Sequence, residues 1–248
     1  MEAACLGIFM ISAAFFATVL EYPNSIVHRV LPNDFSRLCL MGVAMGLTAI
    51  GINYSPMGKL SGAHMNPAVT LTFLGLEKIK PVDAFFYLIF QMLGGIVAVS
   101  SMAVILGDPF KDSHVNYVVT VPGSSGNTAA FIIELAMAFG MMIMVLITSN
   151  HARLSRYTGL IAGIFVMSYV IVAAPISGFS INPSRTMASA IPSGMYTGFW
   201  IYMTAPFMGM FSAAVIYKLI GARTLCAKMN HDNHYKCIFN CDHDNHNH

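Results

Sequence analysis

The sequence predicts an all-α membrane protein in which six transmembrane helices plus two re-entrant half-helices form an inverted repeat. Three observations support this. Hydrophobic residues make up 56% of the chain and charged residues only 10%, whereas a soluble domain carries about a quarter charged residues. Apolar segments of membrane-spanning length recur along the whole chain. A ten-residue motif also occurs twice, almost half the chain apart.

In the first half of the chain, the expected elements alternate between full spans and one shorter apolar run. A hydrocarbon core of about 30 Å requires roughly 20 helical residues. Spans are expected at Ala3–Leu20, Leu38–Tyr54 and Ala84–Leu106, with a half-helix at Pro67–Leu76. The first run is interpreted as a retained helix rather than a signal peptide, because an acidic Glu2 stands where a basic region would be needed.

The second half repeats the same order of elements after the loop from Asp108 to Thr128. Spans are expected at Ala129–Ile147, Gly159–Ala174 and Gly198–Ile220, with a half-helix at Pro183–Ile191. Each half has three spans, so the second half should be inverted in the membrane relative to the first.

The repeated motif explains where the half-helices begin. It reads SGAHMNPAVT from Ser61 and SGFSINPSRT from Ser177. Asn is a strong helix N-cap and Pro is favoured at the first helical position. One Asn-Pro pair would indicate only a turn, but two pairs in matching frames predict two helix starts that meet near the membrane midplane. Their positive N-termini would repel cations, and the Asn amides could donate to a passing oxygen.

With these features, roughly residues 1–221 resemble the aquaporins, or major intrinsic proteins. The resemblance implies one pore per subunit and a homotetramer in the cell membrane. It identifies two pore motifs, of which the second has Ser in place of the usual Ala: Asn66, Pro67 and Ala68, and Asn182, Pro183 and Ser184. His64, two residues before the first box, matches a pore-lining histidine. Its alternative role is to satisfy a loop carbonyl.

The same resemblance implies a four-position selectivity filter. Arg185 matches its arginine, and counting back from the second box places Phe179 and Val170 at two further positions. The fourth is Gly46 by simple counting, or Met45 if the loop before the first box carries an extra residue. Such a filter would be wider and less polar than a strict water filter, so the expected solutes are water and small uncharged molecules such as glycerol.

Two acidic residues lie inside expected spans, Glu2 and Glu134, each in the first span of its half. Intramembrane carboxylates suggest proton relays by default. The resemblance favours a structural role instead, in which each carboxylate binds backbone amides of a re-entrant loop.

The last segment, residues 222–248, changes to a polar tail rich in Cys and His. Cys226, His231, Cys237 and Cys241 form a C-x4-H-x5-C-x3-C pattern, followed by His243, His246 and His248. Thiolate and imidazole ligands suit tetrahedral zinc. The alternative is a solvated low-complexity tail. No cofactor is expected for transport itself.

The distribution of charge gives the expected orientation and excludes several classes. Lys and Arg are more frequent in the loops on the side of both termini, which predicts a multi-pass protein with cytoplasmic termini. A net charge of +2, not concentrated in one stretch, argues against nucleic-acid binding. The sequence offers neither paired carboxylates nor a Ser/His/Asp set, so nothing in it indicates an enzyme. An ion-coupled transporter is the remaining rival, although it should bury more charge. A further alternative is a channel for another neutral solute with a metal-responsive tail.

Overall fold

The computed structural model describes residues 1–231, 234 and 237–242, and within them every regular element is helical. Six helices are long and apolar enough to cross a membrane. These are α1 (Glu2–Glu21), α3 (Asp34–Tyr54), α6 (Pro81–Ile105), α8 (Gly126–Ser149), α9 (Thr158–Ser177) and α11 (Phe199–Leu219). The shorter elements are α2 (Ile26–Val30), α4 (Pro56–Ser61), α5 (Pro67–Gly75), α7 (Asp108–Lys111), η1 (Asn116–Val118), η2 (Ser155–Tyr157) and α10 (Pro183–Ser193). All six expected spans and both half-helices are therefore present.

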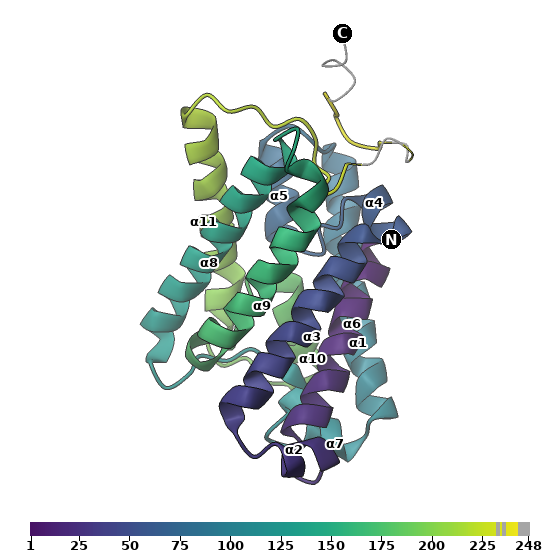
Figure 1. Ribbon diagram of the computed structural model, residues 1–248, viewed down its shortest axis with the longest axis vertical. Helices are drawn as coiled ribbons and strands as arrows, with labels where there is room; N and C mark the ends of the chain where they lie inside the picture. The colour runs from purple at the N-terminus through teal and green to yellow at the C-terminus, as the bar shows by residue number, and fades with distance from the viewer. Residues whose placement is uncertain (232–233, 235–236, 243–248) are drawn as a thin grey trace.

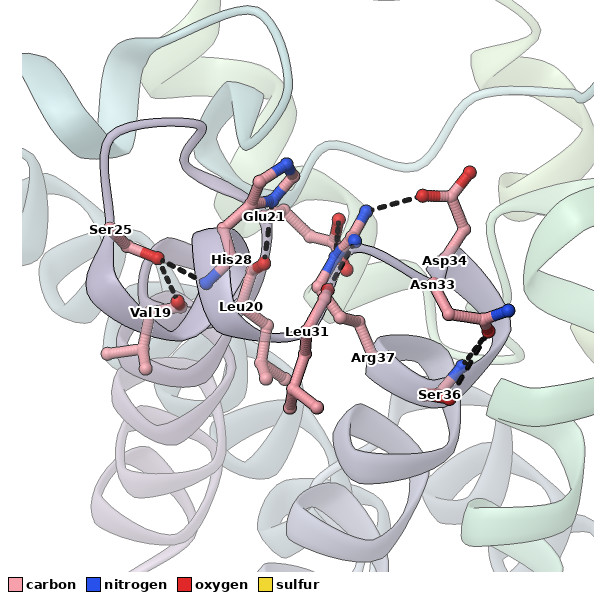
Figure 2. A network of polar contacts seen from close by, with 10 residues as sticks. All are labelled: Val19, Leu20, Glu21, Ser25, His28, Leu31, Asn33, Asp34, Ser36 and Arg37. Atoms are coloured by element: carbon pink, nitrogen blue, oxygen red, sulfur yellow. Dashed lines mark hydrogen bonds and ion pairs between the residues drawn. The ribbon is translucent and has the colours of Figure 1, made fainter.

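Helix α3 begins at Asp34, four residues earlier than its apolar composition indicated. Asn33 caps it by accepting a hydrogen bond from the Ser36 amide at 2.9 Å. The charged Arg37 is buried within the helix because its guanidinium pairs with Glu21 at 3.1 Å and with Asp34 at 2.6 Å (Figure 2). Paired charges let a helix continue through residues that hydropathy alone would place in a loop.

The long helices pack at glycines that occupy matching positions in the two repeats. A β-carbon on Gly94 of α6 would collide with the backbone of Ala3 in α1, and one on Gly209 of α11 would collide with Leu135 in α8. Small residues at such crossings allow backbones to approach closely. The α1–α6 pair of the first repeat therefore has a counterpart in the α8–α11 pair of the second.

The two half-helices lie inside the bundle, with α5 nearer the end that carries the chain termini and α10 nearer the opposite end (Figure 1). Each begins at its Asn-Pro pair as expected. The Asn66 side chain accepts from the Ala68 amide at 2.9 Å, and Asn182 accepts from the Ser184 amide at 3.1 Å. Side-chain caps of this kind satisfy amides that a helix start leaves without partners.

The tail does not extend away from the bundle. From the end of α11 its described residues run across the end of the molecule towards α4, where the N-terminus also lies (Figure 1). The end of the molecule that these residues cross is the tail side.

Candidate functional site

The two half-helices are joined at their N-termini by reciprocal hydrogen bonds. Asn66 Nδ2 donates to the Ile181 carbonyl at 2.7 Å, and Asn182 Nδ2 donates to the Met65 carbonyl at 2.7 Å. A side-chain amide carries two hydrogens, so each asparagine keeps a second one. Both asparagines line one cavity of about 90 Å³ inside the bundle. The sequence placed them far apart in the chain, and the fold brings them to one point.

The loops that lead into the half-helices have the same strained backbone in both repeats. Ala63 and Met65 have φ values of 54° and 49°, and Phe179 and Ile181 have values of 48° and 47°. Left-handed backbone is uncommon outside glycine and is an outlier for a β-branched residue such as Ile181. Strain of this kind persists only where surrounding contacts hold it.

In the first repeat, Glu2 supplies those contacts. Its carboxylate accepts hydrogen bonds from the backbone amides of His64 at 3.2 Å and Met65 at 2.6 Å. Ser61 Oγ and Gln91 Nε2 also donate to it, each at 2.7 Å. The buried carboxylate therefore binds the loop backbone from within the bundle.

Glu134 has the equivalent place in the second repeat. It accepts from Ser177 Oγ at 2.8 Å and from the amides of Ser180 at 2.9 Å and Ile181 at 2.6 Å. Both of its oxygens accept hydrogen bonds, so this carboxylate holds the backbone of the second loop as Glu2 holds that of the first.

Two tyrosines also bind backbone at the start of these loops, and sequence reasoning missed them. Tyr87 donates its hydroxyl hydrogen to the Ser61 carbonyl at 2.7 Å, and Tyr202 donates to the Ser177 carbonyl at 2.5 Å. The signal that could have found them is their spacing of 115 residues, which equals that between Gly94 and Gly209.

The filter candidates fall into two groups. Arg185 and Phe179 line the cavity with the two asparagines. Arg185 Nη1 is buried and has no hydrogen-bond partner among the described residues. Met45 and Val170 are buried in the apolar cluster that contains Phe179. A β-carbon on Gly46 would lie 2.7 Å from the Gly163 carbonyl of α9, so Gly46 serves the close packing of α3 on α9.

His64 also lines the cavity, and both of its ring nitrogens have protein partners. Nδ1 lies 3.0 Å from Thr70 Oγ1, and Nε2 lies 2.7 Å from the carbonyl oxygen of Ala227 in the tail. The ring stacks between Phe73 and Phe239, at centroid distances of 5.2 Å and 5.6 Å. His64 is thus part of the cavity wall, and the carbonyl that it contacts belongs to the tail rather than to the loop.

The four cysteine and histidine residues of the tail converge. One ligand atom from each of Cys226, His231, Cys237 and Cys241 lies within 4.8 Å of the others. The two Sγ atoms of Cys226 and Cys237 are 3.5 Å apart, and Cys241 Sγ is 3.2 Å from His231 Nε2. Tetrahedral zinc with these ligands needs separations of about 3.6–3.8 Å, so small shifts would suffice. His243, His246 and His248 lie outside the described residues.

The thiols of Cys226 and Cys237 are in direct contact. The pKa of Cys237 is lowered to about 3, chiefly because the Cys226 thiol donates a hydrogen bond to its thiolate. The pKa of Cys226 is raised by that same bond and by burial. A thiolate is the form that ligates metal.

Two half-helices that meet N-terminus to N-terminus at one cavity, inside a bundle of membrane-length helices, define an inverted-repeat pore protein. The family model for "Major intrinsic protein" matches residues 2–217. The chain belongs to this family, as the paired Asn-Pro motifs predicted. The family consists of channels rather than enzymes.

Curated plant proteins are similar to the chain. It is 36% identical to Aquaporin NIP1-2 of Arabidopsis thaliana over 73% of this chain and 63% of that protein. It is 34% identical to Aquaporin NIP2-2 of Zea mays over 87% of this chain and 72% of that protein. The similarity to the first relative thus covers somewhat less than two thirds of that protein's length.

A solved structure confirms the predicted fold class. The X-ray structure of the aquaglyceroporin from Plasmodium falciparum superposes with a TM-score of 0.68 and 22% identity, covering 87% of this chain and 92% of the other. At this identity the likeness concerns the fold.

Proposed function

We propose that the chain forms a passive membrane channel for water and small uncharged solutes. The observation that carries the proposal is the pair of asparagine amides, each with one hydrogen left, at a single cavity. Each amide can donate this hydrogen to the oxygen of a water molecule or hydroxyl group that passes through the cavity. The positive ends of α5 and α10, together with Arg185, disfavour cations and protons.

For the filter we propose Arg185, Phe179, Val170 and Met45. Gly46 is replaced by Met45 in this set because Gly46 faces Gly163. One guanidinium beside three apolar side chains gives a solute both a hydrogen-bonding side and a carbon-facing side. Glycerol has this amphipathic character, and the fold neighbour from Plasmodium falciparum is titled an aquaglyceroporin.

The proposed setting is the cell membrane, with both termini in the cytoplasm and residues 222–248 as a cytoplasmic tail after the channel domain of residues 1–221. Arg37 supports this orientation, because its pairing with Glu21 and Asp34 removes a free positive charge from the opposite side. We propose one pore in each chain, because both repeats of a single chain build the cavity, and a homotetramer, because the chain belongs to the major intrinsic protein family.

Osmotic flow through reconstituted protein tests the channel. Proteoliposomes, prepared with protein as purified and with protein treated with EDTA, should shrink faster than empty liposomes in at least one of the two states. Flow should have a low activation energy, and glycerol should enter as well. Flow that matched empty liposomes in both states would refute the channel. Flow that required an ion gradient would also refute it and would favour a transporter.

We further propose that the tail binds zinc, on the evidence of the four converging ligands. Three sulfurs and one imidazole form a set typical of structural zinc sites. Elemental analysis of purified protein should find about one zinc per chain. A Cys237→Ser, Cys241→Ser variant should lose it, whereas Cys39→Ser, which removes a thiol from α3, should retain it. Equal zinc contents in these variants would contradict the site.

A further inference from the structure

The first tail segment lies directly against the wall of the cavity. The Ala227 carbonyl oxygen is 2.7 Å from His64 Nε2, and the Met229 amide donates to the Gly62 carbonyl at 3.3 Å. Met229 is 6% exposed and lines the same cavity as Asn66 and Asn182. A residue of the tail therefore forms part of the cavity wall on the tail side.

A second tail segment covers the same end. Phe239 stacks on the far face of His64 and contacts Tyr87, with ring centroids 6.2 Å apart. The next residues are fastened to the loop after α5. The Asn240 amide donates to the Lys78 carbonyl at 3.0 Å, and Asp242 pairs with the Lys78 ammonium at 2.6 Å.

The tail is also attached to the other repeat. The Leu225 amide donates to Asn150 Oδ1 at 2.5 Å, and Asn150 follows the end of α8. The described tail is thus attached to both the loop after α8 and the loop after α5, and Figure 1 shows its backbone crossing this end of the bundle.

The four ligands are placed to hold these two segments together. Cys226 immediately precedes the segment that contains Ala227 and Met229, while Cys237 and Cys241 flank Phe239. Residues 226–231 and 237–242 contain no helix or strand, and single backbone hydrogen bonds, such as that from the Asp242 amide to the Leu225 carbonyl at 2.9 Å, connect them to their surroundings. A metal bound by all four ligands would close both segments into one unit.

Lys228 provides a second observation at the cluster. Its side chain is 1% exposed, and its ammonium has no hydrogen-bond partner among the described residues. Its charge acts on Cys237. A buried charge requires a counter-charge, and zinc bound by three thiolates and a neutral imidazole carries one net negative charge.

We infer that the tail is a metal-locked plug: zinc bound by Cys226, His231, Cys237 and Cys241 holds Met229 in the tail-side end of the pore and closes it, and metal loss releases the plug. The inference rests on the proposed channel function. Closure follows from the position of Met229 in the cavity, and dependence on metal follows from the ligands on either side of it.

The test compares osmotic water permeability of full-length protein reconstituted with and without metal. One preparation is loaded with zinc chloride, and a second is stripped with EDTA before reconstitution at the same protein-to-lipid ratio. Metal-free protein should conduct water several-fold faster, and zinc chloride present on both sides of the membrane should reverse the increase. The Cys237→Ser, Cys241→Ser variant should conduct rapidly with or without zinc, whereas Cys39→Ser should respond as wild type does.

A Met229→Ala variant separates metal binding from closure. It should keep its zinc by elemental analysis and yet conduct several-fold faster than wild type in the zinc-loaded state. Equal flow through zinc-loaded and metal-free wild type, with the zinc content changing as intended, would overturn the plug and leave the channel intact. Absence of flow in every preparation would instead overturn the channel, and the plug with it.

Discussion

Replacing Glu134 with alanine is expected to destabilise the second re-entrant loop and abolish conduction. The carboxylate accepts hydrogen bonds from the amides of Ser180 and Ile181, and Ile181 has a left-handed backbone. Leaving two buried amides without acceptors costs roughly 2–6 kcal/mol. The thermal midpoint in detergent, followed by the fluorescence of Trp200, should therefore fall by roughly 4–24 °C.

Two further variants make this result specific. Glu134→Gln keeps one acceptor oxygen and should lie between wild type and Glu134→Ala. Asp108→Ala removes an exposed acid at the start of α7 and should leave both the midpoint and the flow unchanged. A wild-type midpoint and wild-type permeability in Glu134→Ala would show that the carboxylate does not hold the loop.

Replacing Arg185 with valine is expected to widen the filter and weaken the exclusion of protons. A unit charge about 4 Å from a cation opposes it by about 4 kcal/mol at an effective dielectric constant of 20. Since about 1.4 kcal/mol is a factor of ten in rate, proton conductance should rise at least tenfold. Glycerol and urea should also enter faster, because the guanidinium that lines the cavity is gone.

The matched variant is Arg185→Lys, which keeps the positive charge and loses the planar guanidinium. Its proton conductance should stay near that of wild type while its solute profile broadens. Both variants should be measured as metal-free proteoliposomes, so that the state of the tail does not differ between them. If Arg185→Val retained the wild-type solute and proton profiles, Arg185 would not be part of the filter.

Local patterns were sufficient to predict the order of elements. Apolar runs identified the six spans, and the two Asn-Pro pairs marked the starts of α5 and α10. They were weaker at boundaries, because hydropathy cannot anticipate that a charge will be paired. Arg37 illustrates this: its partner Glu21 lies in α1, and without that pair the start of α3 would be a polar loop.

The choice between Met45 and Gly46 lay beyond local patterns for a different reason. Counting along the chain leaves an uncertainty of one residue, and on a helix one residue changes the direction by about 100°. The close approach of Gly46 to Gly163 shows that Gly46 faces α9, which supports the proposal of Met45 for the filter. Such a contact depends on how two helices cross, which no single segment encodes.

By itself, the sequence determined the inverted repeat, the two helix starts and the presence of four metal-type ligands in the tail, because each of these depends on residue type and short spacing. Only the tertiary structure decided that the tail returns to the cavity, that Ala227 contacts His64, and that Met229 lines the same cavity as the paired asparagines. The contact of Ala227 with His64 joins residues 163 positions apart. The free energy of such contacts arises from burial and hydrogen bonding between surfaces that exist only after both repeats have folded.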